Sequence, residues 1–367
     1  MSLTEVPRTR FADFTRANAV AIAAAFLVAI LVFGLVAAGY HPPKAAPSKS
    51  SGDLATYVRI VSDMRQGQGY YNAAHTELVD GHYGTRSVFN WRLPLLFWIA
   101  AALPSQADVD ALLQALALVT LAVACLWLRL TTSFVITLLA AVTLAGNLCT
   151  CFDGNIFLFS DITAGTLILL SVALYGLRVP VLGFAVALFA LFCRELVAPY
   201  VVLCAVMAWR ERRWWEVSGW VVGVVAFAAY FAWHYFEVHA HIGPRDVAYS
   251  DSWFAFGGLN FILGTATFNG IMVTQPFRLT ALVLPVGLLG LLAWRNDGSA
   301  RAGLTVAVYL ALFLFVGKHF DDYWGALYTP ILMIGIAFAP LALVDLIRAL
   351  GRQSPPSLVE ATGPASP

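Results

Sequence analysis

Two adjacent charged residues, Arg194 and Glu195, stand between apolar stretches and are the first whose types suggest chemistry. Charges in apolar surroundings are costly unless they pair with each other or face a water-filled cavity. One interpretation is therefore an ion pair that closes a helical hairpin. The other is a functional pair, in which Glu195 contacts a ligand or orients the Arg194 guanidinium.

Further acids lie in two places along the sequence. Asp153 and Asp161 flank Gly154-Asn155, and either is suited to contact a ligand, although Asp161 is equally suited to cap the helix that follows. Asp321 and Asp322 are suited to a divalent cation, but adjacent acids point apart on most backbones and no third ligand is evident. No cofactor is therefore expected, and a divalent metal is only weakly indicated.

The composition indicates what surrounds these residues. Of 367 residues, 60% are hydrophobic and 12% are charged, against about 45–50% and about 25% in soluble globular proteins. The mean hydropathy is +0.77. We therefore expect a polytopic membrane protein whose main partner is the lipid bilayer. A formal net charge of +1 gives no basic surface for nucleic acid, and five cysteines without a C-x-x-C pair argue against a zinc ribbon or a disulfide scaffold.

Ten apolar segments are predicted to cross the bilayer, since a spanning helix needs about 20 apolar residues. They are Ala19–Ala38, Asp108–Leu128, Thr132–Leu148, Thr163–Leu177, Val179–Phe192, Leu196–Trp209, Val217–Tyr235, Leu279–Trp294, Gly303–Val316 and Ala326–Leu346. The predicted fold class is thus all-α, with one transmembrane domain over residues 1–350 and a disordered cytoplasmic tail over residues 351–367. The shorter apolar run Pro94–Leu103 is expected to be re-entrant or interfacial.

Basic residues set the expected orientation, because cytoplasmic loops are enriched in Lys and Arg. Arg210-Glu211-Arg212-Arg213 is the clearest cytoplasmic anchor, and it predicts that both termini are cytoplasmic. The other polar groups then gather on the outer face, in a first outer loop over residues 40–107, in a fourth over 237–278 and in shorter loops. The first span is expected to be an uncleaved anchor, because its apolar stretch is longer than a signal-peptide core.

The first outer loop contains a predicted amphipathic helix. Five apolar residues between Leu54 and Met64 recur at spacings of three and four, which predicts a helix from about Asp53 to Gln66. We expect it to lie flat on the membrane with its apolar face down.

This loop resembles the opening of the GT-C glycosyltransferases, integral membrane enzymes that use polyprenyl-phosphate sugars as donors. The matching residues are Asp53, Tyr57, Gly67 and Tyr70, spaced as Asp-x3-Tyr-x9-Gly-x2-Tyr. Further on, Asn90-Trp91-Arg92-Leu93-Pro94 is similar to the superfamily's next landmark. The resemblance in topology covers most of the chain and is closest to the bacterial branch without a large soluble domain.

The resemblance implies that Asp53 is the catalytic base. In the family, the acid near the first span takes the proton of the acceptor hydroxyl as that hydroxyl attacks the anomeric carbon, and the lipid phosphate leaves with inversion. A carboxylate suits this role because it is ionised at neutral pH. Following Ser-Ser-Gly, however, Asp53 also has the position of a helix N-cap.

The resemblance also implies residues that bind the substrates. Lys318 and His319 match the basic residues at the outer end of a late span and lead the candidates for the donor phosphate, followed by Arg194 and Arg92. A structural alternative is that Lys318 reaches to the membrane interface and His319 caps a helix. Candidates for substrate contacts are Tyr57, Tyr70, Asp153, Asp161, Glu195 and Trp253. Trp253 belongs to an aromatic group that also fits an ordinary interfacial belt.

The predicted function is transfer of a sugar from a polyprenyl-phosphate donor to a cell-envelope glycan or glycolipid, on the extracytoplasmic face of a bacterial inner membrane. One alternative is a transporter or flippase for a lipid-linked sugar, which usually has polar residues near the mid-membrane and repeated halves. The other is a non-catalytic subunit of an envelope polysaccharide assembly complex.

Overall fold

The computed structural model describes residues 8–39, 52–244, 246–248, 256–296, 298–318 and 320–352. Over these ranges the regular structure is helical and contains no strand, which confirms the all-α class. Trp253, His319 and residues 353–367 of the predicted tail lie outside the described residues.

Each of the ten segments predicted to span falls on a helix. The helices are α1 (Arg16–Gly39), α5 (Gln106–Thr131), α6 (Phe134–Leu148), α7 (Ser160–Gly176), α8 (Pro180–Cys193), α9 (Ala198–Arg210), α10 (Trp214–His241), α12 (Phe277–Ala293), α13 (Ser299–Phe313) and α14 (Thr329–Leu350). Within the described ranges, five are long and apolar enough to cross a membrane, namely α1, α5, α6 with its extension to Phe152, α10 and α14. The other five have 13 to 17 residues, or about 20–26 Å, so ten crossings remain a prediction.

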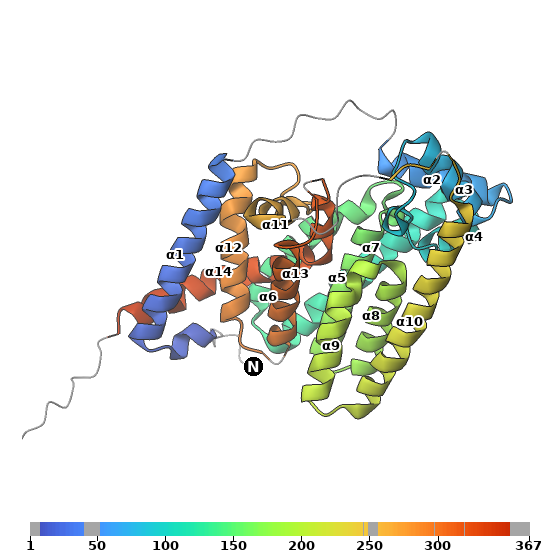
Figure 1. Cartoon of the computed structure of the whole chain (residues 1–367). Coiled ribbons are helices and arrows are strands. Elements are labelled where there is room, and N and C mark those ends of the chain that lie inside the picture. Colours follow the sequence, from blue (N-terminus) through green and yellow to red (C-terminus); the bar gives the residue numbers. More distant parts are fainter. Residues whose placement is uncertain are drawn as a thin grey trace, which may run out of the picture.

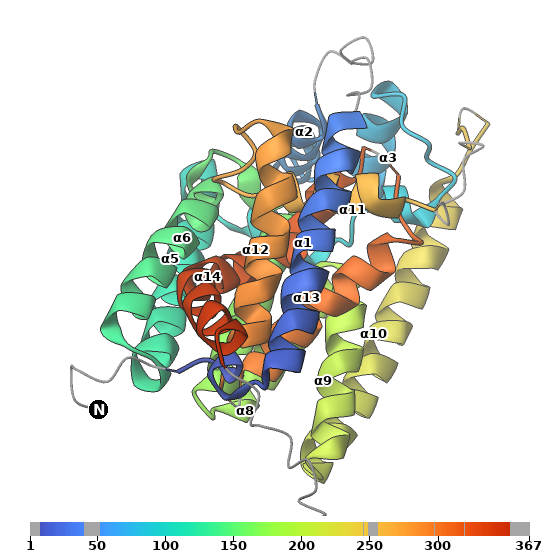
Figure 2. The same cartoon turned by 90° about the vertical axis from the view of Figure 1, so that its left-hand side faces the viewer.

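Helix α7 forms the centre of the bundle. Fifteen of its residues are buried, and it packs against α5, α8 and the loop before α14. Helices α12 and α14 cross closely, and α1 lies against α12 on the outside of the bundle (Figure 1, Figure 2). Leu27, Leu31 and Leu35 on α1 are more than 60% exposed, so this helix presents an apolar surface suited to lipid.

The close crossing of α12 and α14 depends on glycine. A Cβ added at Gly290 would lie 1.8 Å from the carbonyl oxygen of Gly335, so the two backbones would have to separate. We expect Gly290→Ala to destabilise the protein by about 1–3 kcal/mol, as overpacking does. Gly303→Ala on α13 is the matched control, because its Cβ meets nothing within 4 Å. Thermal unfolding in detergent should show a lower midpoint for Gly290→Ala alone, and equal midpoints would contradict this account of the crossing.

Three short helices gather at one end of the bundle, α2 (Asp53–Arg65), α3 (Tyr70–Asp80) and α4 (Leu95–Ala102) (Figure 1). The helix predicted from Asp53 is confirmed as α2. The expectation that its apolar face lies on the membrane is wrong, because that face packs against α3 and α4. Tyr57, Ile60 and Val61 are at most 5% exposed, and the Tyr57 ring meets Phe97 edge-on.

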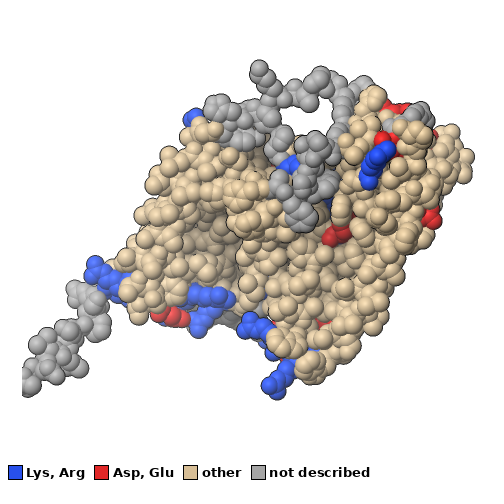
Figure 3. Space-filling model, viewed as in Figure 1, with Lys and Arg blue, Asp and Glu red and all other residues tan. Residues whose placement is uncertain are grey.

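The opposite end of the bundle carries basic residues and both described ends of the chain. Arg352 donates to the carbonyl of Phe14 at 2.8 Å, and Arg295 pairs with Asp13. Figure 3 shows Lys and Arg side chains along this edge, away from α2 and α3. Helix α11 (Gly258–Thr267) completes the fold and packs against the 3-10 turn Asp322–Leu327.

Candidate active site

Arg194 lies between α8 and α9 and is 3% exposed. Its Nε donates to Asp161 Oδ1 at 2.9 Å, and its Nη1 donates to Glu195 Oε1 at 3.0 Å. The structure therefore shows the ion pair with Glu195 that one of the two interpretations described, and Asp161 is a second partner of Arg194. The alternative in which Asp161 caps a helix is wrong, because Phe159 occupies the N-cap position of α7 and Asp161 lies in the first turn.

Arg92 is held by two tyrosines from distant parts of the chain. It is 8% exposed, its Nε donates to Tyr57 Oη at 2.8 Å, and its Nη2 donates to Tyr323 Oη at 3.2 Å. Its guanidinium carbon lies 5.7 Å and 5.6 Å from the centroids of these two rings. The Tyr70 hydroxyl donates to the backbone carbonyl of Arg92. Two tyrosines predicted as substrate contacts therefore position this arginine.

Unlike Arg194, Arg92 forms no ion pair with any carboxylate that the structure describes. A guanidinium stays charged in proteins, and a buried charge without a counter-charge is costly. The two phenol oxygens and the ring faces satisfy part of its hydrogen bonding but carry no full negative charge. The arrangement is therefore suited to an anionic ligand.

Asp321 joins this group from the loop before α14. It is 1% exposed, its Oδ1 accepts from Tyr323 Oη at 3.1 Å, and its Oδ2 accepts from the backbone N–H of Lys318 at 3.1 Å. Burial raises the pKa of the Asp321 carboxyl, against the opposing effect of these hydrogen bonds and of Arg194 and Arg92. No metal-binding group of three or more His, Cys, Asp or Glu occurs among the described residues.

Asp53 is the first residue of α2 and is partly buried. Its Oδ1 accepts a hydrogen bond from Tyr83 Oη at 2.7 Å. The N-cap interpretation of Asp53 is wrong, because Gly52 occupies that position and no side chain caps the helix. Burial and the neighbouring carboxylate raise the pKa of Tyr83, so the phenol keeps the proton that it donates to Asp53.

We call these residues together the charged cluster, which consists of Asp53, Tyr57, Arg92, Asp161, Arg194, Glu195, Asp321 and Tyr323. Hydrogen bonds join α2, the segment before α4 and the loop before α14 in one group, and the start of α7 and the α8–α9 turn in a second group. The charges of Asp53 and Arg194 both act on Tyr57, and those of Arg92 and Arg194 both act on Asp321. Five separate segments thus bring their polar groups to one end of the bundle.

Other predicted site residues fall outside this cluster. Asp153 is exposed, and among the described residues its side chain makes no hydrogen bond or ion pair with the cluster. Lys318 reaches the cluster through its backbone, and its ammonium lies 5.7 Å from the Phe320 ring centroid. Tyr83 and Tyr323 were missed from the sequence, although Tyr323 stands beside the predicted Asp321-Asp322 pair.

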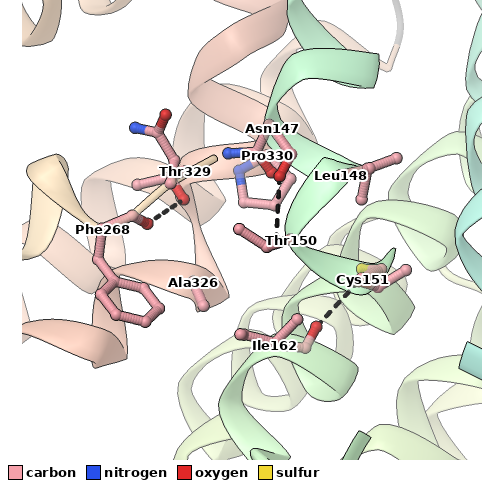
Figure 4. A pocket seen from close by; sticks show the side chains of 11 residues that line it. Asn147, Leu148, Thr150, Cys151, Ile162, Phe268, Ala326, Thr329 and Pro330 are labelled. Atoms are coloured by element: carbon pink, nitrogen blue, oxygen red, sulfur yellow. Dashed lines mark hydrogen bonds between the residues drawn. The ribbon is translucent and has the colours of Figure 1, made fainter. Parts of the chain in front are cut away.

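A pocket lies beside the charged cluster, between the end of α6 and the starts of α7 and α14 (Figure 4). Phe268 lines it and stacks on Phe159 with ring centroids 6.2 Å apart. Phe159 in turn meets Tyr323 edge-on at 5.0 Å. These ring contacts connect the pocket to the charged cluster, of which Tyr323 is a member.

No protein-family model, curated protein or solved structure matches this chain. Its helices and their apolar surfaces define an α-helical membrane protein. The site is defined by its own geometry, as a buried charged cluster at the end of the bundle opposite to both described chain ends.

Proposed function

We propose that the chain is a membrane glycosyltransferase of the GT-C type. It moves a sugar from a polyprenyl-phosphate donor to a cell-envelope glycan or glycolipid, with inversion, on the extracytoplasmic face of a bacterial inner membrane. The observation that carries the proposal is the buried Arg92, which has no paired carboxylate among the described residues and is held by Tyr57 on the helix that begins with Asp53. An anion-binding cation and a carboxylate thus belong to one cluster.

The proposed chemistry assigns opposite roles to the Asp53 carboxylate and to the cationic groups. Asp53 accepts the proton of the acceptor hydroxyl, whose oxygen forms a bond to the anomeric carbon as the bond from that carbon to the phosphate oxygen breaks. The electron pair of the broken bond leaves with the lipid phosphate. Arg92 and Arg194, with Lys318 and His319 as further candidates, stabilise this charge in surroundings where water is largely excluded.

Donor binding supplies the test of this proposal. The purified protein in liposomes should transfer label from a polyprenyl-phosphate sugar to an acceptor glycan in added envelope lipid. Arg92→Gln should weaken donor binding by roughly 10- to 100-fold, because a hydrogen bond to a charged group is worth about 1.5–3 kcal/mol. Arg65→Gln is the control for the same chemical change, since Arg65 is exposed at the end of the neighbouring helix α2 and donates to the Ala100 carbonyl.

Two outcomes would overturn the proposal. The first is donor lipid that moves across the bilayer without any sugar transfer, which would favour a flippase. The second is equal donor affinity in Arg92→Gln and the unmodified protein, which would exclude Arg92 as a phosphate ligand and remove the observation on which the proposal rests.

A further inference from the structure

The pocket beside the charged cluster differs from it in chemistry. Its empty space measures about 280 Å³, part of which is open to solvent. Threonines, asparagines, a cysteine and apolar residues line it, and none of its lining residues is charged. Figure 4 shows these side chains converging from α6, α7, α14 and the segment after α11.

Asn147 gives the pocket a hydrogen-bond donor without a partner. The residue is 4% exposed, and its Nδ2 is buried with no hydrogen-bond acceptor among the described residues. A buried N–H group left unpaired costs about 1–3 kcal/mol. Asn147 is therefore suited to an acceptor that enters the pocket from beyond the described residues.

Three threonine hydroxyls give the pocket its hydrogen-bond acceptors. Thr150 donates to the Asn147 carbonyl at 3.2 Å, Thr166 to the Ile162 carbonyl at 2.9 Å and Thr329 to the Phe268 carbonyl at 3.1 Å. A hydroxyl that gives its proton to a carbonyl still accepts through its oxygen lone pairs. The lining therefore offers an amide donor together with hydroxyl acceptors.

A hydroxyl group complements this lining, since it accepts from an N–H and donates to an oxygen. A phosphate or an ammonium does not, because no lining residue would balance its charge. The enclosed part of the pocket has room for about one or two water-sized groups, so a hydroxyl-bearing arm enters while the rest of the ligand stays at the mouth.

We propose that this pocket is a second binding site, which takes a hydroxyl-bearing arm of an uncharged polyol ligand. The contacting rings of Phe159 and Tyr323 lie between Phe268, which lines the pocket, and Arg92, to which Tyr323 is hydrogen-bonded. A sugar headgroup and the glycerol of a lipid share the required chemistry. The site does not depend on the proposed sugar transfer, because its test measures binding alone.

Cys151 is the reporter for this test, because it lines the pocket and is 1% exposed. The native chain in phosphatidylcholine nanodiscs is treated with methyl methanethiosulfonate, and labelling of each cysteine is followed by mass spectrometry. Octyl glucoside below its micellar concentration should slow labelling of Cys151 about threefold at twice its dissociation constant. Octyl phosphate should not slow it, and labelling of Cys125 on α5 should not change.

Two variants distinguish polyol binding in the pocket from a general effect of the added amphiphile on thiol labelling. Asn147→Leu removes the donor, and Thr166→Val removes one acceptor with little change of shape. Because Thr166 Oγ1 lies 3.6 Å from the reporter Cys151 Sγ, protection in each variant is the ratio of its own labelling rates with and without the polyol. In both variants octyl glucoside should no longer slow the labelling of Cys151 appreciably. In Asn72→Leu, at an exposed position on α3, it should slow that labelling as in the unmodified protein. Should Asn147→Leu fail to fold, Thr166→Val decides the question.

Monooctanoylglycerol distinguishes the two sources of the polyol. Protection by this lipid but not by octyl glucoside would support the site and identify the glycerol of a lipid as its ligand. The proposal is overturned by three results: no protection by either polyol, equal protection by octyl phosphate, or unchanged protection in both variants.

Discussion

Asp53→Asn is expected to lower sugar transfer by about 10²–10⁴-fold, the usual contribution of a general base. The amide has nearly the shape of the carboxylate but does not take the acceptor's proton. Its oxygen still accepts the hydrogen bond from Tyr83, so the start of α2 should keep its position. Donor affinity should change little, because donor binding in the proposal rests on Arg92.

The measurement is the initial rate of label transfer from a polyprenyl-phosphate sugar, together with donor affinity in the same liposomes. Asp63→Asn is the matched control, because it makes the same chemical change on the same helix α2. Full activity in Asp53→Asn would remove Asp53 from the mechanism. A similar loss in both variants would instead point to damage to α2.

The helices of this protein were largely predictable from its sequence. Uninterrupted apolar runs can satisfy their backbone polar groups in lipid only as helices, so the ten segments were found by length and hydropathy. The spacing between Leu54 and Met64 likewise predicted α2 almost to the residue. Periodicity shows only that a face is apolar. It does not show what covers that face. The burial of Tyr57 and Ile60 against other parts of the protein, rather than against lipid, was therefore not predicted.

The charged cluster was predictable only in part, because its contacts join residues far apart in sequence. Arg92 and Tyr323 are 231 residues apart, and no local pattern pairs them. Local capping preferences also made helix caps an alternative interpretation of Asp53 and Asp161. In the structure Tyr83 and Arg194 engage these acids instead, from 30 and 33 residues away. Residue type therefore identified most members of the cluster, whereas tertiary contacts determined their roles.

The largest effect on stability is expected from Arg194. Arg194→Met would leave Asp161 fully buried without the guanidinium that balances its charge. Removing one partner of a buried ion pair typically costs about 3–5 kcal/mol. Asp161 Oδ2 already lacks a hydrogen-bond partner among the described residues, so the carboxylate has no second donor to compensate.

The double variant Arg194→Met/Asp161→Asn tests whether the unbalanced charge of Asp161 causes this loss of stability. Neutralising Asp161 removes the unbalanced charge, so the double variant should recover part of the stability lost in Arg194→Met. The single variant Asp161→Asn completes the cycle, which gives the coupling energy. Arg129→Met at an exposed position on α5 is the control and should unfold like the unmodified protein. Thermal unfolding in detergent compares these variants with the unmodified protein. An Arg194→Met midpoint equal to that of Arg129→Met would show that the pair does not hold α7 to the α8–α9 turn.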